Sequence, residues 1–148
     1  MHVNSDYLEI PSDKSNMNTR DLIGPALDWA VAMCRGFEGM DEDQWLLRDG
    51  LADMPLSAYN PSTDWSQGGP FIERERIILV PKSFVGATES GQEICQPDGW
   101  AAYCRGTKPY WMTVEMYYGA TPLIAAMRCF VAMKLGDRVE IPKELQCW

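Results

Sequence analysis

Histidine is nearly absent from this chain, since the only one among 148 residues is His2. This excludes Ser-His-Asp and Cys-His catalytic arrangements and any metal centre built from several histidines. The five cysteines form no Cys-x-x-Cys pair, and there is neither a Gly-x-x-x-x-Gly-Lys loop nor a dinucleotide fingerprint. We therefore expect a protein that is not an enzyme, with no catalytic residues, no metal site and no cofactor.

Basic residues are outnumbered, with 13 Lys and Arg against 21 Asp and Glu and a net charge of -8. A negative field repels a phosphate backbone, which argues against nonspecific nucleic-acid binding. The acids are scattered apart from one short run, Asp41-Glu42-Asp43, which is typical of a solvated face. A secretory leader and an apolar run of membrane length are also missing, so we predict a cytoplasmic location, reduced cysteines and no membrane contact.

The composition predicts one ordinary globular domain, because 46% of the residues are apolar and 23% are charged. Residues 1–17 are polar, lack periodicity and contain Pro11, so we expect a flexible N-terminal arm before a single domain at residues 18–148. Thr19 can cap a helix to about Cys34, in which Pro25 either introduces a kink or separates the first turn. A second main helix is predicted from Thr121-Pro122 to Leu135, and Gly136 ends it.

Strand patterns lie between these two helices. Ile77–Val80 is a β-branched run closed by Pro81, and residues 82–98 read as a long polar loop. Trp100–Cys104 and Tyr110–Met116 flank turn residues and predict a hairpin with Trp111 on its exposed face, a platform for stacking or self-association. Residues 37–60 are expected to be mostly irregular, with room for a short helix or strand. The fold class is therefore α+β, with a small antiparallel sheet of about three to four strands packed by two main helices.

The most informative stretch is Ser62–Arg74, which combines an aromatic ring, a carboxylate, an amide, two glycines and Pro70. Proline favours the first helical position, so a short helix is predicted over Pro70–Glu75. The free N–H groups of such a helix start can bind an anion or be capped by Asp64 or Ser66.

Aromatic rings are abundant, with six Trp and six Tyr, and several stand near Arg or Lys in predicted loops. Rings stack on bases and guanidinium groups bind phosphates, which is what a nucleotide pocket requires. The alternative is that the rings fill the core, which we favour for Trp29 and Trp100 and leave open for Trp65 and Trp111. The candidate ligand-binding residues are Asp64, Trp65, Gln67, Arg74, Tyr103, Arg105, Lys108 and Trp111.

Three blocks, Thr19–Ala32, Ser62–Arg74 and Thr121–Arg128, resemble a family of small phage and prophage proteins of the NinX type. The likeness spans residues 19–137. It implies a phage origin and one compact domain, and it supplies no catalytic residues. For a phage protein, the cytoplasmic location that we predict is the cytoplasm of the host cell. The chain departs from the family pattern at Arg76, where glycine is usual, and arginine adopts positive φ reluctantly.

Phage accessory proteins of this size often act against host immunity. We therefore expect a non-catalytic counter-defence protein that sequesters a small nucleotide-type immune signal, assembled as a homo-oligomer with pockets between protomers. An alternative is an acidic inhibitor that binds a host defence enzyme through protein-protein contacts. A further alternative is an enzyme that degrades the nucleotide signal.

Overall fold

The computed structural model describes residues 14–36, 39–40, 45–49, 52–55 and 58–146. In chain order the elements are β1 (Lys14–Asn18), the 3-10 turn η2 (Thr19–Asp21), α2 (Gly24–Cys34), β2 (Gly39–Met40), β3 (Trp45–Asp49), β4 (Ala52–Pro55), α3 (Trp65–Glu75), β5 (Ile78–Ala87), β6 (Glu93–Tyr103), β7 (Tyr117–Gly119), α4 (Pro122–Leu135), β8 (Arg138–Pro142) and the 3-10 turn η4 (Lys143–Leu145). The strands form antiparallel sheets in the orders β1-β8, β2-β3-β4 and β5-β6-β7. The predicted α+β class is confirmed.

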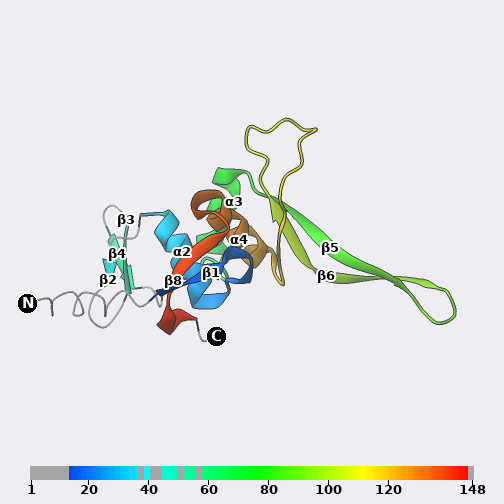
Figure 1. Ribbon diagram of the computed structural model, residues 1–148, viewed down its shortest axis with the longest axis horizontal. Helices are drawn as coiled ribbons and strands as arrows, with labels where there is room; N and C mark the ends of the chain where they lie inside the picture. The colour runs from blue at the N-terminus through cyan, green and yellow to red at the C-terminus, as the bar shows by residue number, and fades with distance from the viewer. Residues whose placement is uncertain (1–13, 37–38, 41–44, 50–51, 56–57, 147–148) are drawn as a thin grey trace, which may run out of the picture.

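Helix α4 is the centre of the core, as its apolar sequence predicts. The Thr121 hydroxyl accepts a hydrogen bond from the Ile124 N–H at 3.2 Å, and Gly136 ends the helix with φ 91°. The helix packs against α2, α3 and the base of the β5-β6-β7 sheet (Figure 1). Its buried residues include Met127, Phe130 and Val131, so one hydrophobic core joins the helices and this sheet.

Helix α2 starts at Gly24 and not at Thr19, where the sequence predicted the start of the helix. Thr19–Asp21 forms a separate 3-10 turn, and Pro25 lies in the first turn of α2, where its missing N–H costs no hydrogen bond. Of the two outcomes that Pro25 allowed, the separated first turn is therefore confirmed. Arg128 of α4 stabilises the junction, because its guanidinium donates to the Leu22 carbonyl at 2.8 Å and to the Tyr118 carbonyl at 2.7 Å.

The predicted arm over residues 1–17 is wrong at its C-terminal end. Lys14–Asn18 forms strand β1, which pairs with β8 from Lys14↔Pro142 to Asn18↔Arg138. The sequence of β1 is polar and offers no local strand signal, because its partner lies at the other end of the chain. Residues 1–13 lie outside the described residues.

The predicted polar loop over residues 82–98 is also wrong. These residues belong to a long hairpin, in which β5 and β6 pair from Ile78↔Tyr103 to Ala87↔Glu93. Pro81 interrupts the local strand pattern without ending the strand, since a register shift between Pro81 and Ser83 accommodates it at the sheet edge. Figure 1 shows the far part of this hairpin projecting away from the helices.

The hairpin predicted from Trp100–Cys104 and Tyr110–Met116 does not form. Strand β6 pairs with β5 on one side and with β7 on the other, from Trp100↔Gly119 to Ala102↔Tyr117. Residues 104–116 form an irregular loop instead, so Trp111 lies in a loop and not on a sheet face.

The segment 37–60, which was expected to be mostly irregular, contains the short strands β2, β3 and β4. Within this segment, residues 37–38, 41–44, 50–51 and 56–57 lie outside the described residues.

Helix α3 begins earlier than the predicted Pro70–Glu75. Asp64 is its N-cap, with the carboxylate accepting from the Ser66 N–H at 2.9 Å, which confirms the capping interpretation. Pro70 lies inside the helix and not at its first position. Arg76 ends the helix in the left-handed region with φ 55° and ψ 46°, so the chain adopts there the backbone conformation for which glycine is better suited.

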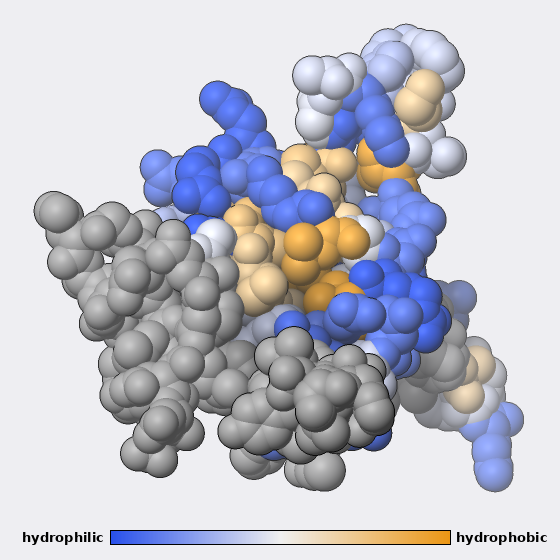
Figure 2. All heavy atoms as spheres, turned by 60° about the vertical axis from the view of Figure 1, so that its left-hand side comes forward, coloured by the Kyte–Doolittle hydropathy of each residue, from blue (hydrophilic) through white to orange (hydrophobic). Residues whose placement is uncertain are grey.

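Hydrophobic surface remains visible on the outside of the molecule. Figure 2 shows a hydrophobic area in the middle of one face, bordered by hydrophilic residues. Within the part of the chain that the structure describes, no helix has the length and apolar character needed to cross a membrane.

Candidate functional site

One face of helix α3 forms the wall of a surface pocket. Gln67, Phe71 and Arg74 follow one another at spacings of four and three residues, which places them on the same side of the helix. The pocket has a volume of about 260 Å³. Its lining residues are Arg35, Tyr59, Ser66, Gln67, Pro70, Phe71 and Arg74.

Two guanidinium groups share the ring of Phe71. The central carbon of Arg35 lies 5.6 Å from the ring centroid and that of Arg74 lies 5.1 Å from it. Phe71 is buried and packs on Phe130 of α4 with the ring centroids 4.7 Å apart, so the ring is fixed to the core. The pocket therefore holds two cations on a rigid aromatic support, in a chain of net charge -8.

Tyr59 adds a buried hydroxyl group to this pocket. Its side chain is 4% exposed, and burial raises the pKa of the phenol, while the neighbouring Arg35 guanidinium opposes the rise. The Arg35 guanidinium acts on this hydroxyl both through a hydrogen bond and through its charge. The hydroxyl therefore adds a polar atom next to Arg35 at the wall of the pocket.

Asp64 and Gln67, both candidate ligand residues, are engaged within the protein. Hydrogen bonds from Ser66, followed by Gln67, hold the pKa of the Asp64 carboxyl below its usual range. The Gln67 amide donates to the Ala58 carbonyl at 3.1 Å and accepts from the Asn60 N–H at 2.8 Å. These contacts fix the segment that carries Tyr59, so both side chains position the pocket wall.

The remaining candidates on α3 differ in position. Trp65 is 54% exposed and does not line the pocket. Arg74 lines it, and its Nε donates to Glu75 Oε2 at 3.0 Å, which holds the guanidinium beside Phe71. Arg74 thus lies against the ring of Phe71, whereas the sequence predicted that it would pair with Trp65.

The other four candidates lie near the loop 104–116. Tyr103 ends β6, and the Arg105 guanidinium donates to the carbonyls of Pro109 and Met112 at 2.8 and 2.9 Å, which closes the loop on itself. Trp111, within this loop, is 70% exposed. Lys108 contributes to a different cavity of about 280 Å³, beside residues of α4.

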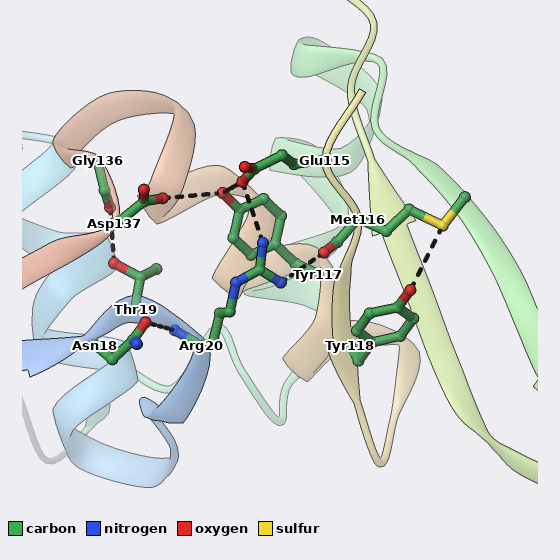
Figure 3. Close-up of polar contacts among 9 residues, drawn as sticks. All are labelled: Asn18, Thr19, Arg20, Glu115, Met116, Tyr117, Tyr118, Gly136 and Asp137. Atoms are coloured by element: carbon green, nitrogen blue, oxygen red, sulfur yellow. Dashed lines mark hydrogen bonds and ion pairs between the residues drawn. The ribbon is translucent and has the colours of Figure 1, made fainter. Parts of the chain in front are cut away.

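The base of this loop is held to the body by a polar cluster. Figure 3 shows Arg20 of η2 lying over the Tyr117 ring, with 4.4 Å from the guanidinium carbon to the ring centroid. Arg20 donates to Glu115 Oε2 at 3.1 Å and to the Met116 carbonyl at 2.8 Å, and the Tyr117 hydroxyl donates to the same Glu115 oxygen at 2.9 Å. Burial, and then the Glu115 and Asp137 carboxylates, raise the pKa of Tyr117, so this phenol stays protonated.

The structure therefore brings two of the eight candidates, Gln67 and Arg74, into the pocket of α3. Sequence reasoning missed Arg35 and Tyr59, which reach the same pocket from the end of α2 and from the segment before α3. The signal available for them was weak: a cation directly after a helix and a tyrosine beside the turn residues Asn60-Pro61. In the described ranges, His, Cys, Asp and Glu form no group of three or more that could hold a metal ion.

Fold and site define the class: a small α+β domain with an arginine-flanked pocket on an otherwise acidic chain. The family model described as Bacteriophage P22, NinX matches residues 18–134, and the chain belongs to this family. The chain is thus a protein of phage type, and the resemblance seen in its three sequence blocks is confirmed. None of the curated proteins matches it.

Proposed function

We propose that this protein is a counter-defence protein that binds and sequesters a small anionic nucleotide of the host immune response, in the host cytoplasm and without turning it over. The observation that carries the proposal is the pair Arg35 and Arg74 on the Phe71 ring, beside the buried Tyr59 hydroxyl. Guanidinium groups bind phosphate oxygens with charge-assisted hydrogen bonds.

The size and chemistry of the pocket support a ligand of this class. A volume of about 260 Å³ is near the lower end for small-molecule sites, which suits one phosphate and part of a nucleoside. Sequestration needs only affinity, and the pocket lining consists of two arginines, a tyrosine, a serine, a glutamine, a proline and a phenylalanine. This set can bind and orient an anion, and among the described residues that line the pocket there is no histidine, carboxylate or cysteine suited to proton transfer or nucleophilic attack.

The test is calorimetric titration of the purified protein with cyclic mononucleotides, cyclic dinucleotides and modified dinucleotides. We expect at least one to bind with micromolar affinity or better. Arg74→Ala and Arg35→Ala should each weaken binding by about tenfold or more, because each removes a charge-assisted contact. Arg76→Ala is the matched control, since this exposed arginine does not line the pocket. No binding tighter than micromolar for any member of the panel would defeat the proposal.

A second measurement separates sequestration from catalysis. The complex is denatured after prolonged incubation, and the released ligand is analysed by mass spectrometry. Sequestration predicts intact ligand, whereas an enzyme would yield product. A protein that instead captures a host enzyme in a salt-sensitive complex, with no nucleotide bound, would favour the acidic inhibitor.

A further inference from the structure

Glu75, the last residue of α3, holds the guanidinium of Arg74 in one orientation. The Arg74 Nε donates to Glu75 Oε2 at 3.0 Å, and the Arg74 side chain is 59% exposed and lines the pocket. Among the described residues, the terminal nitrogens Nη1 and Nη2 of Arg74 make no hydrogen bond. The donors that remain for a ligand are therefore those of the Nη1–Nη2 edge.

The Glu75 carboxylate is itself fixed from a second helix. Helices α3 and α4 pack side by side (Figure 1), and Lys134 of α4 places its ammonium nitrogen 3.4 Å from Glu75 Oε1. The Glu75 side chain is 16% exposed, and its backbone carbonyl accepts a hydrogen bond from the Cys104 thiol at 3.2 Å. These contacts restrict both the side chain and the backbone of Glu75, so it is a rigid acceptor for Arg74.

The aromatic rings of the core complete this support. The Lys134 ammonium lies 5.8 Å from the centroid of the Phe130 ring, and Phe130 packs on Phe71. The Arg74 guanidinium carbon lies 5.1 Å from the centroid of the Phe71 ring. Arg74 is consequently held by Glu75 through its Nε and by the ring that its guanidinium covers.

The charge of Glu75 does not make the site negative. Partial burial acts to raise the pKa of Glu75, but hydrogen bonds from Arg74 and Lys134, together with their charges, hold this pKa below its usual range. The ionised carboxylate lies between these two cations, and Arg35 is a third cation on the Phe71 ring. Three cations thus surround one acid, so this part of the surface attracts an anion although the chain has a net charge of -8.

We infer that Glu75 is a positioning residue of the α3 pocket, which occupies the Nε–H of Arg74 and thereby turns the Nη1–Nη2 edge toward a phosphate group of the ligand. That edge presents two parallel N–H donors to two phosphate oxygens, which is a bidentate geometry for phosphate recognition by arginine. The inference rests on the proposed function in one respect, that the ligand carries a phosphate group.

The experiment titrates the full chain with inorganic phosphate and follows binding by NMR. Glu75→Leu should weaken binding by about tenfold, because Arg74 loses its acceptor. Glu75→Gln should weaken it less, since the amide oxygen can still accept from Nε. If Glu75 acted through its charge alone, both variants would bind phosphate equally and more tightly than the wild type. The matched control is Glu73→Leu, an exposed acid of α3 that does not line the pocket, which should stay within about twofold of the wild type.

A double variant tests whether Glu75 acts through Arg74. In the Arg74→Ala background, Glu75→Leu should cause no further loss of affinity, because the guanidinium that it positions is gone. Losses that add in the double variant overturn the inference. Phosphate binding by Glu75→Leu that is as tight as in the wild type, or Glu75→Gln binding as weakly as Glu75→Leu, overturns it as well.

A measurement on the wild type guards against variants that fail to fold. The Nε–H signal of Arg74 should stay protected from exchange with water when phosphate saturates the pocket, because Glu75 keeps this hydrogen bond. Loss of protection would show that phosphate displaces Glu75 and would overturn the inference, as would a wild type that binds no phosphate. Glu75-dependent phosphate binding without binding of any nucleotide leaves the inference standing while the proposed function fails. Nucleotide binding that is equally tight in Glu75→Leu gives the opposite result.

Discussion

Asp28 brings a carboxyl group into the hydrophobic core. The residue is 5% exposed on α2, and its Oδ1 accepts a hydrogen bond from the Ser62 N–H at 2.9 Å. Burial raises its pKa from 3.8 to about 6, although the hydrogen bonds from Ser62 act in the opposite direction. The group therefore connects α2 to the segment before α3, and its ionisation costs the folded state free energy.

The pH dependence of stability follows from this shift. Between about pH 4 and pH 6 the folded protein holds a proton that the unfolded chain has lost, so the contribution of Asp28 falls as pH rises through this window. A shift of about two pH units corresponds to about 3 kcal/mol. Asp28→Asn should remove this fall, which denaturant unfolding at a series of pH values measures as the difference between variant and wild type.

The control for this prediction is Glu140→Gln, which changes an exposed acid on β8. It should leave the pH dependence between pH 4 and pH 6 nearly unchanged. Parallel curves for Asp28→Asn and the wild type would show that the Asp28 carboxyl ionises in the folded protein as it does in the unfolded chain.

At the scale of elements, helix α3 packs closely against its neighbours because Gly68 has no side chain. A Cβ on Gly68 would collide with the Pro61 carbonyl oxygen and lie 2.8 Å from Leu123 Cδ2, whereas on Gly69 it would meet only Trp65 at 3.9 Å. Gly68→Ala should lower the free energy of unfolding by about 1–3 kcal/mol through overpacking. Gly69→Ala should raise it by up to about 1 kcal/mol, because alanine favours the helix. Thermal or denaturant unfolding of the pair measures both, and equal effects would contradict the close approach.

Elements specified by neighbouring residues were predictable, and those specified by distant residues were not. The boundaries of α4 follow from Thr121, Pro122 and Gly136, which act within one turn of the helix. Strand β1 depends on β8 at the opposite end of the chain, and its own sequence is polar. The β5-β6 hairpin was missed because Pro81 breaks the apolar pattern in the middle of a strand that continues past it.

The residues of the candidate site divide in the same way, into those that local sequence brings together and those that only distant packing brings together. Gln67 and Arg74 share one helix, so their spacing alone brings them together. Arg35 and Tyr59 enter the same pocket only through the packing of α2 and the segment before α3, which local pattern does not reveal. Trp111 was assigned to a sheet because the alternation in residues 110–116 imitates a strand, whereas Arg105 holds the surrounding residues as a loop.

At the scale of the whole molecule, the two ends of the domain close on each other. Most of β1 and all of β8 lie outside residues 18–134, the range that matches the family, and they pair with each other. The closure continues at Thr19, whose hydroxyl donates to the Gly136 carbonyl at 2.7 Å and whose N–H donates to the Asp137 carbonyl at 2.8 Å. The matched range is therefore completed by a two-stranded sheet that joins the N-terminal and C-terminal sides of the core.

This closure predicts that a residue outside the family match supports the entire fold. Ile141 of β8 is fully buried in the core cluster, while its neighbour Glu140 is exposed on the same strand. Ile141→Ala should lower the free energy of unfolding by about 2–5 kcal/mol, because it leaves a cavity where the two ends meet. Glu140→Ala should change it by less than about 0.5 kcal/mol. Circular dichroism and tryptophan fluorescence should report one common transition for Ile141→Ala. A loss confined to one probe would mean that β1 and β8 form an appendage, with the core stable in their absence.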